Sequence, residues 1–176
     1  MKKIVGFGNT IYIYSIVIGL MTMFGSHYSN FFKILFEKIN LDYYAFFILI
    51  YGIILLVLNI IYCLKSWNNQ EDNVKIYFIN KIIQIPAYTF IFLAGLLFFV
   101  SFLGMPMAIL LFIIDLFSIV LTGIYSLPIF NQIRKKGIIN KKIQIIYSIF
   151  SFIFCIDVMI AIIVYIQKKA FCRTNI

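Results

Sequence analysis

Two aspartates, Asp115 and Asp157, have a type and placement that could support chemistry in this 176-residue chain. Each lies inside a long apolar run, and an ionised carboxylate at the centre of a membrane span costs about 3 kcal/mol on insertion scales. Each is also roughly nine residues from the same membrane surface on the expected helices, so we expect both carboxyls at a similar depth. Intramembrane carboxyls usually face a bundle interior or a water-filled path for ions or protons.

The two carboxyls support two hypotheses. The first is a proton-sensitive or cation-binding pair in a transport path, and the second is a pair of neutral, hydrogen-bonded groups that hold helices together. The available partners in this possible polar or proton site are tyrosine hydroxyls and the polar residues Ser118, Thr122 and Asn59. No lysine, arginine or histidine is expected at mid-membrane depth, so at least one carboxyl should be protonated at neutral pH.

The sequence contains no recognised catalytic or metal-binding motif. Ile114-Asp115 and Ile156-Asp157 lack the G-x-G-D context of intramembrane aspartyl proteases, and no G-x-S-x-G, H-E-x-x-H or phosphate-binding loop occurs. The three cysteines are far apart and His27 is the sole histidine, which indicates neither a disulfide framework nor a zinc site. We therefore expect a non-enzymatic protein that uses no cofactor or metal.

The composition places the chain in a lipid bilayer. It is 64% apolar and 12% charged, whereas a soluble domain is about half apolar and a quarter charged. Lipid cannot satisfy backbone amides, so spans must be helices or a closed barrel, and unbroken apolar runs such as 43–64 exclude the alternating strands of a barrel. The net charge of +9 comes from bases at the ends of apolar segments, which suits lipid headgroups and does not indicate nucleic-acid binding.

The apolar segments predict an all-α fold, a polytopic transmembrane helical bundle of five helices, with four as the alternative. The whole chain, 1–176, is expected to be one transmembrane domain, with its first segment retained as a helix rather than cleaved as a signal peptide. Gly104-Met105-Pro106 is the expected reversal within a long apolar run, and Pro128 is the expected exit from the fourth span. The predicted spans are approximately 8–26, 43–64, 86–103, 107–127 and 143–166.

The distribution of basic residues predicts the orientation. With five spans, one side receives the N-terminus and the connections 65–81 and 134–142, which together hold ten Lys and Arg, and the other side holds five. The positive-inside rule then places the N-terminus in the cytoplasm and the C-terminus outside the cell membrane. If the first segment lay on the membrane surface, the Lys and Arg residues would divide eight to seven between the two sides of the membrane. The positive-inside rule would then predict no orientation.

Each expected span carries a stripe of small or polar residues, the feature through which helices associate in lipid. The fifth span shows two nearly opposite faces, one with Ser148 and Ser151 and one with Asp157 and Ala161. A helix with two such faces is either enclosed within the bundle or meets another chain. The stripes of the other spans are Gly8, Ser15, Gly19, Thr22 and Ser26; Ala45, Gly52 and Asn59; Ala87, Ala94 and Ser101; and Ala108, Asp115, Ser118 and Thr122.

These observations predict a small multi-pass membrane protein that acts through helix packing, as an accessory, immunity-type or partner-binding subunit. The expected partners are the lipid bilayer and either further copies of this chain, as a homo-oligomer, or a larger membrane protein. The alternative is a small proton- or cation-linked transporter or channel that uses Asp115 and Asp157.

Overall fold

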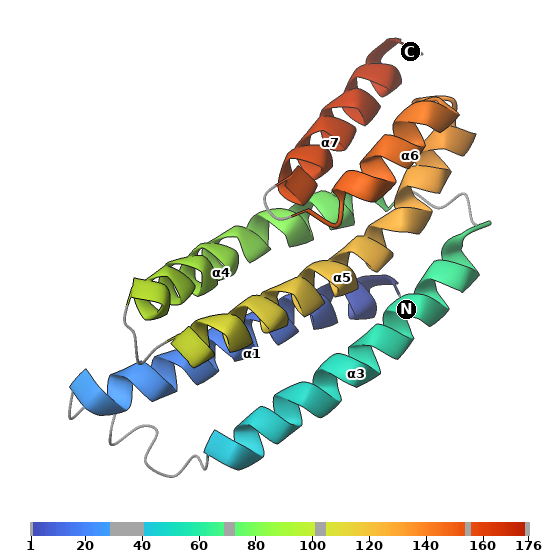
Figure 1. The fold of residues 1–176 in the computed structure, drawn as a ribbon. Helices are drawn as coiled ribbons and strands as arrows, with labels where there is room; N and C mark the ends of the chain where they lie inside the picture. Colours follow the sequence, from blue (N-terminus) through green and yellow to red (C-terminus); the bar gives the residue numbers. More distant parts are fainter. Residues whose placement is uncertain (1, 29–40, 69–72, 101–104, 154–155, 175–176) are drawn as a thin grey trace.

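The computed structural model describes residues 2–28, 41–68, 73–100, 105–153 and 156–174. Within these ranges all regular structure is helical, and six helices confirm the predicted all-α bundle (Figure 1). Four of them, α1, α3, α4 and α5, contain stretches long and apolar enough to cross a membrane, which is the architecture of a multi-pass membrane protein. The helices are α1 (Lys2–Tyr28), α3 (Leu41–Ser66), α4 (Val74–Val100), α5 (Met105–Lys135), α6 (Lys141–Phe150) and α7 (Ile156–Thr174).

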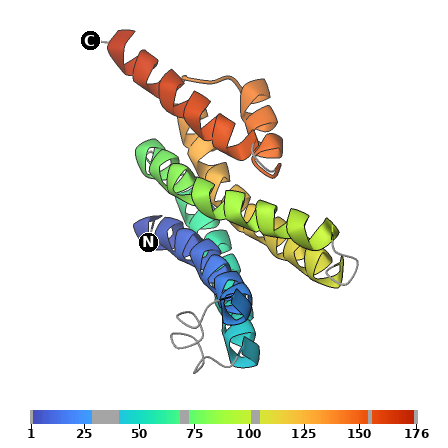
Figure 2. The ribbon, with the colours of Figure 1, turned by 90° about the vertical axis from the view of Figure 1, so that its left-hand side faces the viewer.

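Successive long helices run in opposite directions, so α1 and α4 are parallel to each other and antiparallel to α3 and α5 (Figures 1 and 2). Hydrogen bonds fix the register of α1 on α3. The Tyr44 hydroxyl donates to the Ser15 carbonyl at 2.7 Å, and two turns away along α1 the Asn59 amide donates to Asn9 at 2.8 Å. Because α1 packs against all three of the other long helices, it belongs to the core of the bundle.

Small residues let these helices approach closely, as the stripes predict. A β-carbon at Gly52 would lie 2.9 Å from the Phe117 ring and 3.0 Å from the Tyr12 ring. Gly8 and Gly19 meet side chains of α3 in the same way. Ala45 is exposed, and the side chains of Ser26 and Ser101 lie outside the described part of the structure. The stripe residues that are buried include Thr22, Asn59, Ala87, Ala94, Ser118 and Thr122.

α5 is longer than the predicted fourth span. The prediction that Pro128 marks its exit is wrong, because the helix continues through this proline to Lys135. A proline inside a helix removes one backbone hydrogen bond. Packing outweighs that loss here, since the side chains of Ile129, Phe130 and Ile133 are at most 1% exposed.

α4 is also longer than the predicted third span. It begins at Val74 and passes through Pro86, near which the span was expected to start. The additional turns look like a polar loop in the sequence, yet several of their polar side chains are buried against other helices. α4 ends at Val100 and α5 begins at Met105, so the chain reverses where predicted, although Gly104 itself lies outside the described residues.

The segment predicted as a fifth span, 143–166, is two helices rather than one. α6 and α7 form a hairpin, in which the Gln167 side chain donates to the Tyr147 hydroxyl at 3.1 Å. After α6, the amides of Phe152 and Ile153 donate to carbonyls three residues back, at 3.2 and 3.1 Å. This tighter hydrogen-bonding pattern ends α6 without glycine or proline, which is why the sequence does not reveal the turn.

The hairpin changes the position of the C-terminal end. Because α7 returns along the bundle, the chain ends lie at the same end of the molecule, whereas five spans predict opposite ends (Figure 2). The hairpin also explains the two faces of the expected fifth helix, since α6 packs on α5 and α7 packs on α4. Ser151, Asp157 and Ala161 are all buried within this chain, so neither face is evidence for a second chain.

Candidate functional site

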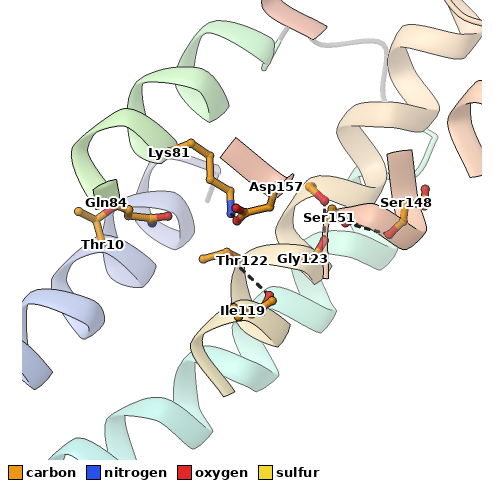
Figure 3. A network of polar contacts seen from close by, with 10 residues as sticks. Thr10, Lys81, Gln84, Ile119, Thr122, Gly123, Ser148, Ser151 and Asp157 are labelled. Atoms are coloured by element: carbon orange, nitrogen blue, oxygen red, sulfur yellow. Dashed lines mark hydrogen bonds and ion pairs between the residues drawn. The ribbon is translucent and has the colours of Figure 1, made fainter. Parts of the chain in front are cut away.

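A buried ion pair joins α4 to α7 in the interior of the molecule. The Lys81 ammonium donates to Asp157 Oδ2, and both side chains are 3% exposed. Figure 3 shows the two side chains pointing toward each other, one from α4 and one from the first turn of α7. Removing charges from water costs several kcal/mol per ion, and only close pairing offsets that cost. The ion pair is therefore a buried point of contact between α7 and α4.

The expectation that no cation reaches the intramembrane carboxyls is wrong. It follows from a third span that begins near residue 86, which would leave Lys81 in a loop. In the structure Lys81 lies two turns inside α4, and its side chain runs into the interior (Figure 3). The sequence does contain a signal that the helix begins before residue 86. Polar side chains recur there at the three- and four-residue spacing of one helix face: Tyr77, Lys81, Gln84 and Tyr88.

The same face of α4 contacts the neighbouring helices through polar groups. Gln84 Nε2 donates to the Thr10 hydroxyl of α1 at 3.1 Å. The Tyr88 hydroxyl lies beside Thr122 of α5 and within electrostatic reach of both aspartates. These contacts form a polar cluster between α1, α4, α5 and α7, and the cluster contains the Lys81–Asp157 ion pair.

Asp115 differs from Asp157 in its surroundings. The structure places Asp115 half-buried on α5 and within electrostatic reach of Asp157, but the hydrogen bond of Asp157 is to Lys81. Among the described residues, the buried Oδ1 atom of Asp115 has no hydrogen-bond partner. Among the described residues, Lys81 therefore compensates the charge of Asp157, and no ion pair is seen for Asp115.

Ser118 and Thr122, the expected hydroxyl partners of Asp115, bond to their own helix. Ser118 Oγ donates to the Ile114 carbonyl at 3.0 Å, and Thr122 Oγ1 donates to the Ile119 carbonyl at 3.2 Å. A serine or threonine that bonds a carbonyl of its own helix satisfies its hydroxyl without help from a neighbour. These predicted site residues share one face of α5 but no hydrogen bond with the carboxyl.

Asn59, the remaining predicted site residue, joins α3 to α1 instead. Asn59 Nδ2 donates to Asn9 Oδ1 at 2.8 Å, and Asn9 Nδ2 donates back to Asn59 Oδ1 at 3.1 Å. Both side chains are buried. A reciprocal amide pair holds two helices in one register within lipid. Asn9 has no distinguishing spacing in the sequence, so its role emerges only from its contact with Asn59.

Comparisons with known proteins give no functional assignment. No protein-family model, curated protein or solved structure matches the chain. Within the described ranges, no group of three or more His, Cys, Asp or Glu side chains is placed to hold a metal ion. The chemistry that these residues offer at the polar cluster is that of one lysine, two carboxyls, and neighbouring amides and hydroxyls.

Proposed function

We propose that the protein is a small non-enzymatic subunit of the cell membrane, of accessory or immunity type, which acts by packing its helices against a partner. The use of the interior polar groups supports this. An amide pair joins α1 to α3, an amide–hydroxyl pair joins α1 to α4, and an ion pair joins α4 to α7. Pairs of this kind hold helices together in lipid, and a group already paired is not free to bind a moving ion.

The observation that carries the proposal is the half-buried Asp115 carboxyl, whose Oδ1 atom has no hydrogen-bond partner among the described residues. Asp115 is the eleventh residue of the 31-residue α5, which puts its carboxyl about 15 Å along the helix axis, near mid-membrane depth. It lies on the border between the buried face of α5 and the outward side chains of Phe112 and Leu116, which are 62% and 45% exposed. A partner helix that packs on this border, with a basic or hydrogen-bond-donating group at the same depth, would satisfy the carboxyl.

We expect Asp115 variants to weaken assembly and to leave the fold intact. With a photoreactive residue at Leu116, wild-type protein should form discrete cross-linked species in native membranes. Asp115→Leu should reduce their yield about tenfold, the equivalent of roughly 1.4 kcal/mol, and Asp115→Asn should reduce it less because the amide can still form a hydrogen bond. A photoreactive residue at Leu64 of α3, which is 75% exposed, provides the control for collisions in lipid.

The transport alternative predicts a different result from the same variants. The purified chain in liposomes would then carry a pH-dependent flux of protons or cations, which Asp115→Asn would abolish. Such a flux, together with an absence of discrete species from position 116, would overturn the proposal. A discrete complex that Asp115→Leu disrupts, without flux, supports it.

The proposal places both chain ends in the cytoplasm. With α6 and α7 as a returning hairpin, 13 of the 15 Lys and Arg lie toward the end of the bundle that holds the two chain ends. The other two, Lys33 and Lys38, lie in the connection between α1 and α3. The 13 to two division of Lys and Arg is more uneven than the ten to five division that five spans predict. The positive-inside rule therefore favours the basic end in the cytoplasm.

Cys172 can report this orientation because it is exposed near the end of α7. In a variant that keeps Cys172 as its single cysteine, an impermeant maleimide should label inverted vesicles and leave intact cells unlabelled. A second variant with Gly104→Cys as its single cysteine, between α4 and α5, should be labelled in intact cells. Labelling of both Cys172 and Gly104→Cys in intact cells would restore the five-span topology and contradict the hairpin.

A further inference from the structure

An apolar pocket of about 730 Å³ opens between α3 and α5, with α1 as its floor. Ile16 of α1 and Leu111 of α5 are buried at the bottom of the pocket, whereas Leu49 and Ile113 on its rim are 59% and 60% exposed. Its lining, which belongs to the described helices, includes no charged side chain. The hydroxyl of Tyr44 at its edge already donates to a carbonyl of α1. The pocket therefore offers hydrocarbon contacts to whatever enters it.

Two tyrosines join α3 to α1 at the pocket and beside it. The hydroxyls of Tyr44 and Tyr51 donate to the carbonyls of Ser15 and Gly8 at 2.7 and 3.2 Å. The two tyrosines are two turns apart on α3, and each bond ties its turn of α3 to the backbone of α1. Tyr44 lines the pocket and Tyr51 lies outside its lining, so contacts within the chain set the separation of α1 and α3 at the pocket and beside it.

The pocket lies at the depth of lipid chains. Its α3 wall runs from Tyr44 to Ile53, which is about 14 Å of helix and close to half of a ~30 Å hydrocarbon core. This wall belongs to the stretch Tyr43–Ser66, which is long and apolar enough to cross a membrane. The wall is nearer the start of that stretch, so the pocket spans the leaflet away from the basic end of the bundle.

The length of the pocket favours one of the two occupants that a membrane supplies. A transmembrane helix crosses the whole ~30 Å of hydrocarbon, about twice the length of the α3 wall of this pocket. Pockets of roughly 300–1,000 Å³ hold small ligands. We propose that this pocket binds one acyl chain of a membrane phospholipid from the leaflet opposite the basic end, as a site distinct from the fluid lipid around the helices.

The experiment uses the full chain in liposomes that contain a phospholipid with a diazirine midway along one acyl chain. After irradiation, mass spectrometry locates the adducts. Adducts should be about tenfold more frequent on the pocket walls of α3 and α5 than on Leu97 and Val100 of α4, which corresponds to roughly 1.4 kcal/mol of preferential binding. The α4 residues are suitable controls because they are 70% and 86% exposed, more than any residue of the rim.

A filled-pocket variant provides the second measurement. Ala45 lines the pocket, so the indole of Ala45→Trp should occupy it and lower the wall adducts about tenfold. Ile54→Trp lies on the same helix outside the lining and should leave them unchanged. If Ala45→Trp does not fold, the distribution of lipid adducts on the wild-type protein decides. Adducts on each residue in proportion to its exposure would overturn the proposed site. The pocket is lined by Ile113, Ile114 and Phe117 but not by Asp115, so this result is independent of the proposed assembly.

Discussion

Replacing Lys81 with methionine should lower the free energy of unfolding by about 3–5 kcal/mol, because it leaves the buried Asp157 carboxylate without its partner. Methionine retains the length of the lysine stem and removes the charge, so the loss reports the missing ion pair rather than a cavity. The measurement is the midpoint of thermal or denaturant unfolding of purified protein in detergent. Limited proteolysis should also cleave the α6–α7 hairpin faster, since the pair holds α7 on α4.

The double variant Lys81→Met/Asp157→Leu provides the control. Replacing a buried ion pair by apolar residues of similar size is often neutral or stabilising, so the double variant should regain most of what either single variant loses. The coupling energy from this cycle measures how far the two side chains depend on each other, and it includes the cost of the unpaired charge that each single change leaves. Additive losses in the double variant would show that the two side chains act independently and would contradict the pairing.

The same double variant separates packing from transport. If the ion pair is a structural tether, the apolar replacement should fold and still form the cross-linked complex through position 116. A proton or cation path through Asp157 would be lost with the carboxylate, however stable the protein remained. The two hypotheses therefore allow the same stability for the double variant but predict opposite outcomes for its function.

The fold could be predicted from the sequence as far as lipid itself constrains it. Continuous apolar runs imply helices because backbone amides cannot remain unsatisfied in hydrocarbon, and this places α1, α3, α4 and α5. Small residues mark the faces where helices meet, because close approach requires them. Gly52 and Asn59 lie on such a face in the structure, as predicted.

What the sequence could not reveal depends on contacts between distant residues. The first turns of α4 carry charged and amide side chains that read as a loop, and Lys81 is buried only because Asp157 lies opposite it, 76 residues later. The turn between α6 and α7 has no glycine or proline, and apolar runs on both sides read as one span. Asp115 and Asp157 could be identified as unusual from their type and depth, whereas their different partners could not.

The docking of the hairpin should also fail when Gly123 of α5 is replaced by leucine. A β-carbon at Gly123 would lie 2.6 Å from two atoms of the Phe152 ring, a distance that real contacts do not reach. Phe152 lies in the turn between the two hairpin helices, so moving its ring displaces the turn and draws Asp157 away from Lys81. We expect Gly123→Leu to cost about 3 kcal/mol, at the upper end for overpacked cores.

Gly95 of α4 supplies the matched control. Nothing lies within 4 Å of a β-carbon built there, so the side chain of Gly95→Leu meets open space. Leucine is also the better helix former, which should make this change neutral or stabilising by up to about 1 kcal/mol. Combining Gly123→Leu with Phe152→Ala removes the clashing ring and should restore part of the lost stability, measured by the same unfolding midpoint. Equal losses for Gly123→Leu and Gly95→Leu, with no recovery in the combined variant, would mean that the hairpin does not dock through this contact.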